Sequence, residues 1–249
     1  MGYDGTEFSG FQQQPGSIRT VEGELKKALN KMLGVAPKVI PAGRTDSGVH
    51  ATGQVINFKI YQSISDVGLC NALNSLLPKD IQVHTVQSVS DDFHARFASK
   101  KRTYKYYFTQ EKVPIFYSRY VTEVKTKLNM QLISEIPPIF LGQHNFRNFK
   151  ALGSTQKSDV KEIFGFSIEP LSFKTLNGTV LQDIVYELKI TANGFLYKMV
   201  RNIVGSVWEV LRGKIRPDDL QMQLKSEKKL YQYPTAPSKG LWLDSVEYD

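Results

Sequence analysis

The residues best suited to chemistry lie in one short segment, residues 42–51, with the sequence AGRTDSGVHA. A single carboxylate, Asp46, stands two residues after Arg44 and between Gly43 and Gly48. Glycine permits backbone shapes that other residues resist and lets a ligand approach closely. The segment can therefore direct a carboxylate into a site and place a cation beside it. The same residue types are also typical of a turn in which the aspartate bonds its own backbone.

An ionised carboxylate can act as a nucleophile or as a general base. No second acid accompanies Asp46, which disfavours glycosidase chemistry, because that reaction needs two carboxylates around one bond. The single cysteine, Cys70, excludes an intramolecular disulfide and a cysteine zinc cluster. The four histidines are scattered and form no HxxxH or HExxH pair: His50, His84, His94 and His144. The sequence therefore predicts no metal site.

Length and composition are typical of a soluble globular protein. The chain has 249 residues, 41% of them hydrophobic, which is enough for one large domain or two small halves. No apolar run is long enough to span a bilayer. The first residues lack the basic and apolar parts of a signal peptide. We therefore expect a cytoplasmic protein that does not interact with membranes.

The net charge of +8 favours a polyanionic partner, because each neutralised phosphate releases counterions. Five cations cluster along the chain near Phe97, Tyr104 and Tyr106. These candidate phosphate-binding residues are Arg96, Lys100, Lys101, Arg102 and Lys105. Cations interleaved with aromatics can bind phosphates and stack bases. The alternative interpretation is an amphipathic edge strand that carries solvated lysines.

The hydrophobic pattern predicts helices mixed with strands. Helices are expected at Val21–Leu33, capped by Thr20 and ended by Gly34, and at 67–77, 128–136, 195–211 and after Arg216. The helix over 128–136 should stop at Pro137 and Pro138. Strands are expected at 39–40, 54–60, 81–89, 103–108, 160–168, 179–191 and 241–248. Without strict strand–helix alternation, this pattern favours an α+β fold, which we divide into halves at 1–110 and 111–249.

Four segments resemble, in order, the motifs of the tRNA pseudouridine synthase A family. They are YDGTEFSGFQ at 3–12, AGRTDSGVHATGQV at 42–55, DFHARF with RTYKY at 92–106, and NGFLYKMVRNIVG at 193–205. Three positions depart from the family pattern. Phe11 replaces the usual Trp, Thr103 stands where a basic residue is common, and Asn145 replaces an Asp.

The resemblance implies a fold and an activity. The fold would be two ferredoxin-like halves joined through a mixed central sheet, with the active-site cleft between them. The activity would be isomerisation of uridine to pseudouridine in the anticodon arm of tRNA, at positions 38–40, by a homodimer. The reaction involves no redox change, so no cofactor is expected. The alternative is a non-catalytic RNA-binding or tRNA-folding protein on the same fold.

The resemblance also implies roles for individual residues. Asp46 would be the nucleophile, and Arg201 would pair with it. Tyr104 would stack on the target uracil, and Arg44 would help to extrude the nucleotide from its stack. Leu241 would lie against the uracil face.

Overall fold

The computed structural model describes residues 1–153, 158–174 and 180–248, without the side chains of 172–174 and 180–184. The chain forms two compact units: Met1–Lys100 with Trp242–Asp249, and Lys101–Leu241. The boundary expected at residue 110 would have left strand β6 (Lys101–Thr109) in the first half. The strand instead belongs to the second unit, where it pairs with β10 (Val180–Ala192).

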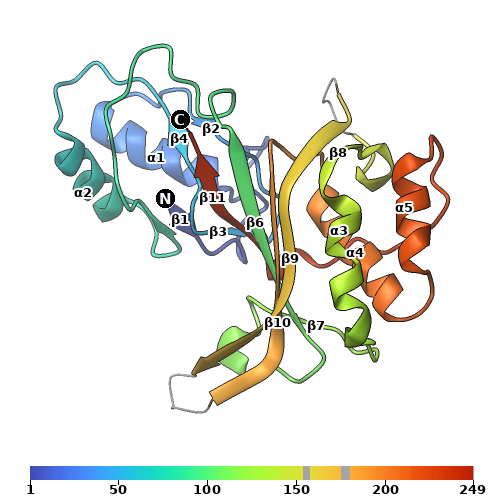
Figure 1. The fold of residues 1–249 in the computed structure, drawn as a ribbon. Coiled ribbons are helices and arrows are strands. Elements are labelled where there is room, and N and C mark those ends of the chain that lie inside the picture. Colours follow the sequence, from blue (N-terminus) through green and yellow to red (C-terminus); the bar gives the residue numbers. More distant parts are fainter. Residues whose placement is uncertain (154–157, 175–179, 249) are drawn as a thin grey trace. The chain divides into compact units, whose positions relative to one another are not determined.

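The first unit contains a small mixed sheet (Figure 1). Its strands follow the order β5 (Ile81–Gln82), β1 (Gly2–Tyr3), β3 (His50–Ala51) and β11 (Leu241–Glu247), the last belonging to this unit from Trp242 onward. The pairings are antiparallel except for the parallel pair of β3 and β11. Strands β2 (Ile40–Pro41) and β4 (Ile56–Asn57) form a separate antiparallel pair.

Two of the strands expected in this unit are much shorter than the sequence pattern predicts. The expected strand at 54–60 is reduced to β4, and the one at 81–89 to β5. Side chains bind the backbone just after β5 and at residues 93–95. The amide of Asn74 binds both the N–H and the carbonyl of Val83, and the amide of Asn57 binds the carbonyl of Phe93 and the N–H of Ala95.

Helices α1 (Val21–Leu33) and α2 (Asp66–Leu76) complete the first unit. As predicted, the Thr20 hydroxyl caps α1 by accepting the Gly23 N–H, and Gly34 ends it in the left-handed conformation at φ 73°. Helix α2 begins one residue earlier than expected. Its cap is Ser65, whose hydroxyl accepts the Gly68 N–H, so Asp66 is the first helical residue.

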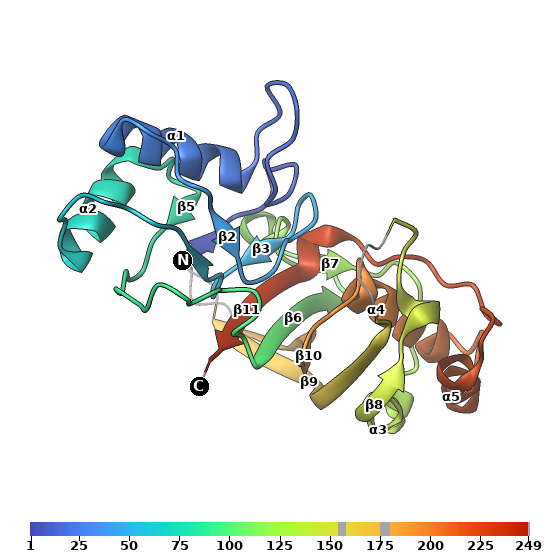
Figure 2. The same cartoon turned by 90° about the horizontal axis from the view of Figure 1, so that it is seen from above.

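The second unit contains a longer sheet, ordered β6, β10, β9 (Val160–Lys174) and β8 (Gly142–Asn145), with β7 (Thr122–Glu123) parallel to β6. The pairings from β6 to β8 are antiparallel. Figure 2 shows the strands and the helices of this unit from a second direction. The expected strand start at Thr179 lies outside the described residues.

Helix α4 (Met199–Leu211) packs on one face of this sheet through Trp208, which contacts Tyr106 and Phe108 edge-on at ring-centroid distances of 5.8 and 5.9 Å. The helix starts four residues later than expected, because Lys198 takes the left-handed conformation at φ 57°. Helix α5 (Pro217–Lys225) follows, with proline in its first turn as the sequence predicts.

The segment around the paired prolines differs from the prediction. Residues Met130–Glu135 form a 3₁₀ helix, and α3 (Pro137–Phe140) then starts at the prolines. Proline lacks the N–H that an interior helical position must donate, but the first turn has no such bond to lose. Paired prolines are therefore compatible with the start of a helix as well as with its end. The remaining 3₁₀ turns are Ile115–Tyr117, Arg147–Phe149 and Ser238–Gly240.

Both units mix strands and helices without strict alternation, so the predicted α+β class is confirmed. Among the helices of the described residues, none combines the length and apolar character needed to cross a bilayer.

Candidate active site

The loop that carries Asp46 is held by the N-terminal motif of the same unit. The Phe11 N–H donates to the carbonyl of Thr45 (3.0 Å), and the Gly48 N–H donates to the carbonyl of Phe8 (3.2 Å). Inside the loop, the Val49 N–H donates to the carbonyl of Asp46 (3.1 Å). The backbone is therefore fixed on both sides of the carboxylate.

Buried side chains hold the loop from a second direction. The hydroxyls of Tyr3 and Thr45 share a hydrogen bond of 2.8 Å. The amide of Gln54 donates to the carbonyl of Gly43 (2.7 Å) and to the Tyr3 hydroxyl (3.3 Å). Burial raises the pKa of Tyr3 to about 12, so its hydroxyl stays protonated at neutral pH.

Two glycines allow the N-terminal motif to lie directly against the loop. A Cβ on Gly5 would stand 2.0 Å from the carbonyl oxygen of Val49. Gly10 has φ +93°, and a Cβ there would stand 2.9 Å from the carbonyl oxygen of Thr45. Any larger residue at these points would push the loop away.

Solvent reaches the side chains of both Arg44 and Asp46 in this loop. Arg44 is exposed and Asp46 is half-buried, whereas Thr45 between them is buried. A fixed backbone that presents a carboxylate and a nearby guanidinium can aim a nucleophile with little reorganisation.

In the second unit, Arg201 lies in the first turn of α4. Its Nε donates to the carbonyl of Ala236 (2.7 Å), and its own carbonyl accepts the Ala236 N–H (3.1 Å). Ala236 belongs to residues 231–240, which we call the strap. The strap thus binds Arg201 through both the guanidinium and the backbone.

The strap is fixed to its unit by further contacts. The Thr235 hydroxyl donates to the side-chain oxygen of Asn202 (2.7 Å), and the Tyr106 hydroxyl donates to the carbonyl of Pro237 (2.9 Å). A Cβ on Gly205 would stand only 1.8 Å from the carbonyl oxygen of Pro234, so the glycine of α4 permits this approach. Burial raises the pKa of Tyr106 well above its usual range, and the positive charge of Arg201 opposes that rise.

Tyr104 and Leu241 are also placed in the second unit. Tyr104 is 8% exposed and meets Phe195 edge-on, with ring centroids 5.1 Å apart. Leu241 is buried and follows Gly240. A Cβ on Gly240 would stand 2.7 Å from the carbonyl oxygen of Tyr107, which shows how closely the strap's end lies against β6.

The five cations that lie near one another in the sequence are divided between the two units. Arg96 and Lys100 are exposed in the first unit. In the second unit, Arg102 shares the face of β6 that carries Tyr104 and Tyr106, because side chains alternate along a strand. Lys105 lies on the opposite face with Lys101, and its ammonium is 3.5 Å from the Glu187 carboxylate.

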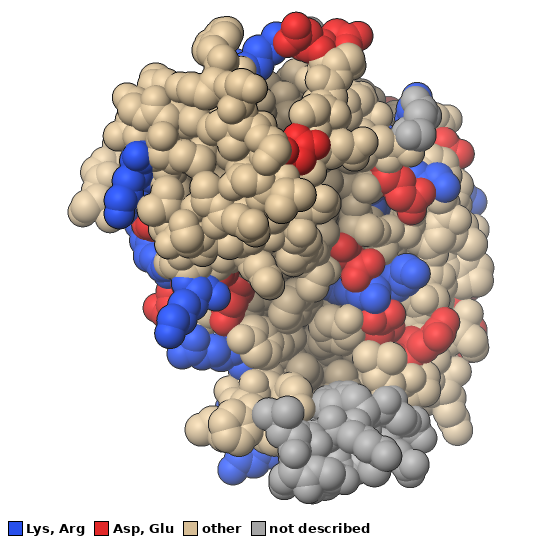
Figure 3. Space-filling model, turned by 90° about the vertical axis from the view of Figure 1, so that its left-hand side faces the viewer, with Lys and Arg blue, Asp and Glu red and all other residues tan. Residues whose placement is uncertain are grey.

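The charge on the face drawn in Figure 3 is mixed. Lys and Arg side chains lie near Asp and Glu side chains there, and wide areas carry neither. That face is not an unbroken basic surface. Among the described residues, no group of three or more His, Cys, Asp or Glu side chains is arranged to hold a metal ion.

The chain matches a family model described as tRNA pseudouridine synthase over residues 1–98 and 138–249. The chain belongs to this family. A tRNA pseudouridine synthase A of Bacillus velezensis is 40% identical over 253 residues, which span 100% of this chain and 97% of that protein. The proteins of the same name from Bacillus subtilis and Limosilactobacillus reuteri are 39% and 38% identical, over 100% and 99% of this chain and 97% and 94% of their own lengths.

The match to the pseudouridine synthase model separates the candidate residues into two groups. Arg44, Asp46, Arg201 and Leu241 lie inside the matched residues, and so does Arg96. Residues 99–137 lie outside the match, and they contain Tyr104, Lys100 and the cations of β6. The matches to the full-length relatives, which cover 100% of this chain, include residues 99–137.

Sequence reasoning missed the residues that hold these candidates in place. Tyr3 and Gln54 lie in the quoted motifs, but nothing in their spacing indicates that they bind each other and the loop. The strap has a sequence, YQYPTAPSKG, that is typical of a surface loop. Its contact with Arg201 joins residues that are 35 positions apart in the sequence, so no local pattern predicts it.

Proposed function

We propose that this protein isomerises uridine to pseudouridine in the anticodon arm of tRNA, at positions 38–40, with Asp46 as the nucleophile. Family membership supports an isomerase that acts on tRNA. The observation that carries the residue assignment is the construction of the 42–49 loop. Its backbone is bound on both sides of Asp46, and within it the Arg44 side chain is exposed and the Asp46 carboxylate is half-buried.

The chemistry needs a carboxylate and no electron carrier. The glycosidic bond from C1′ to N1 of uracil breaks, the base turns, and a bond forms from C1′ to C5. The hydrogen on C5 leaves as a proton and N1 gains one, so the reaction is an isomerisation. A carboxylate can support these steps by nucleophilic attack, provided that it is ionised and held still.

The remaining candidates have supporting roles in the proposal. Arg201 supplies the cation that keeps the nucleophile charged, and the strap orients it. Tyr104 stacks on the target uracil, Arg44 helps extrude the nucleotide, and Leu241 lies against the base. The RNA backbone is bound by cations that include Arg96, Lys100, Lys101, Arg102 and Lys105.

We also propose that the enzyme is a cytoplasmic homodimer that needs neither a metal nor another cofactor. Its partner is tRNA. Light scattering of the purified chain, with and without tRNA, tests the dimer.

The decisive experiment is substitution of Asp46. With tRNA that carries tritium at C5 of uridine, Asp46→Asn should release no tritium above background. Its tRNA affinity should stay close to that of the wild type, because phosphate contacts supply most of the binding. The matched control is Asp91→Asn, since Asp91 is an almost fully exposed carboxylate of the same unit. Mapping of pseudouridine in the product tRNA tests positions 38–40.

Wild-type turnover by Asp46→Asn would remove the nucleophile assignment. Binding of tRNA without any turnover by the wild-type chain would instead favour the alternative of a non-catalytic RNA-binding protein.

A further inference from the structure

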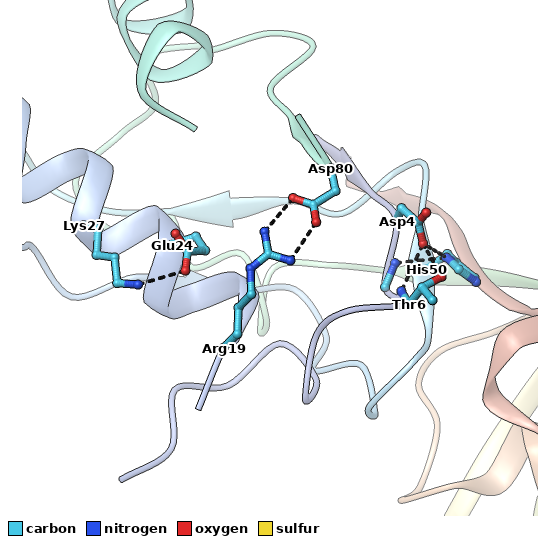
Figure 4. Close-up of polar contacts among 8 residues, drawn as sticks. Asp4, Thr6, Arg19, Glu24, Lys27, His50 and Asp80 are labelled. Atoms are coloured by element: carbon cyan, nitrogen blue, oxygen red, sulfur yellow. Dashed lines mark hydrogen bonds and ion pairs between the residues drawn. The ribbon is translucent and has the colours of Figure 1, made fainter. Parts of the chain in front are cut away.

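A fully buried histidine lies at the exit of the Asp46 loop. His50 has 0% exposure and is the first residue of β3, four residues after Asp46. It is too deeply buried to touch RNA. Figure 4 shows it beside Asp4 and Thr6 of the N-terminal motif.

The contacts of His50 join three segments of the first unit. Its Nδ1 accepts the N–H of Gly5 at 3.0 Å and lies 3.2 Å from a carboxylate oxygen of Asp4. Its ring stacks on Trp242 of β11, with centroids 4.4 Å apart and an interplanar angle of 26°. The N-terminal motif, the loop exit and β11 therefore meet at one imidazole.

The hydrogen bonds indicate what the ring contributes. One nitrogen cannot accept the Gly5 proton and donate to Asp4 at the same time, so the neutral ring uses Nδ1 as the acceptor. The Asp4 oxygen is bound independently by the N–H and the hydroxyl of Thr6, at 3.0 and 2.6 Å. The specific contribution of His50 is then an acceptor for a buried backbone N–H.

This hydrogen bond acts close to the nucleophile. Gly5 lies so near Val49 that a Cβ would stand 2.0 Å from the Val49 carbonyl oxygen. The Val49 N–H in turn binds the carbonyl of Asp46. A shift of Gly5 is therefore transmitted through one residue to the backbone of Asp46.

We propose that His50 is a positioning residue, whose Nδ1 holds the N-terminal motif against the Asp46 loop and thereby fixes the aim of the carboxylate. The inference rests on the proposed function, in which Asp46 is the nucleophile.

Two amide variants distinguish the role of the Nδ1 acceptor from the role of the rest of the imidazole ring. In His50→Asn the side-chain oxygen can occupy the position of Nδ1, whereas in His50→Gln the amide reaches the position of Nε2. Both lose the stack on Trp242. We expect His50→Asn to keep kcat within about threefold and His50→Gln to lose about tenfold or more, because small misplacements of a reacting group cost up to about a hundredfold. KM for tRNA should not change in either.

A third variant and an independent readout keep the test decisive. His50→Phe retains a ring but has no acceptor, so it should behave like His50→Gln. Hydrogen exchange at Gly5 and Val49 should accelerate in the Gln and Phe variants and stay slow in the Asn variant. His84→Asn is the control, because His84 is an exposed histidine of the same unit, and it should match the wild type.

Equal kcat in the Asn and Gln variants, or a wild-type kcat in His50→Phe, would overturn the proposal. So would losses that merely follow the fall in melting temperature. If Asp46→Asn remains active, the proposed function fails. The exchange rates would still show whether Nδ1 holds the loop.

Discussion

Replacement of Gly205 by alanine should disable catalysis without touching a candidate catalytic residue. Gly205 lies inside α4, where alanine is intrinsically better than glycine by about 1 kcal/mol. The helix alone would therefore gain stability. The added Cβ would, however, stand 1.8 Å from the carbonyl oxygen of Pro234 in the strap.

The size of the effect follows from that distance. Contacts of a Cβ below 3.0 Å are essentially never seen, so helix and strap must separate by about 1.2 Å. Ala236 lies two residues further along the strap and binds Arg201 at 2.7 and 3.1 Å. A shift of this size breaks both hydrogen bonds. Misplacement of a positioning group by about 1 Å can cost about a hundredfold in rate, and we expect a fall in kcat of that order.

The assay is tritium release at saturating tRNA, together with tRNA affinity and thermal unfolding. Gly165→Ala is the matched control, because Gly165 lies in β9 of the same unit and a Cβ there meets nothing within 4 Å. We expect Gly165→Ala to behave as the wild type and Gly205→Ala to keep its tRNA affinity. A Gly205→Ala enzyme with the kcat of the control would refute the role of the strap in placing Arg201.

Three further predictions concern stability, binding and cofactors. The pKa of Tyr3 rises from 10 to about 12 on folding. The protonated hydroxyl therefore contributes about 2 to 3 kcal/mol to the free energy of unfolding. This contribution is fully present below pH 10 and is lost as the pH rises toward 12. Denaturant unfolding between pH 9 and 12 should therefore show a shallower loss in Tyr3→Phe, and an unchanged loss would contradict this. Arg102→Ala should reduce the slope of log affinity against log salt by about 0.7 to 0.9, and Lys105→Ala by less, since Glu187 lies 3.5 Å from the Lys105 ammonium. EDTA should leave turnover unchanged once the tRNA is folded, and a loss restored by zinc would disprove the cofactor-free mechanism.

Elements whose information is local could be predicted from the sequence. Helix α1 has the predicted bounds, because its apolar stripe, its Thr20 cap and its Gly34 stop all lie within a few residues. The start of α4 could not be predicted from the sequence, because lysine rarely adopts the left-handed conformation that Lys198 takes here. The strand predicted at 81–89 is too long for another reason. Val83 follows β5 and bonds the side chain of Asn74, nine residues away in α2, and a period-two pattern does not predict such a bond.

The candidate site divides in the same way. The contiguous motifs of the sequence point to Asp46 and Arg201 as candidates, and these assignments stay predictions. The sequence could not give the restraints on them, which link Thr45 to Tyr3 and Arg201 to Ala236 across 42 and 35 residues. The strap is the clearest case, since its prolines and small residues resemble those of an unstructured connection.

The basic cluster shows why adjacency in sequence is a poor guide to a surface. Lys101, Arg102 and Lys105 are close neighbours in the chain, but β6 is a continuous strand whose register with β10 runs unbroken from Arg102 to Thr109. Alternation then sends Arg102 to the face of Tyr104 and Tyr106, and the two lysines to the other face. If the target uridine stacks on Tyr104, as we propose, Arg102 is the one of these three cations that lies on the same face of β6, and its substitution should therefore weaken tRNA binding more than that of either lysine.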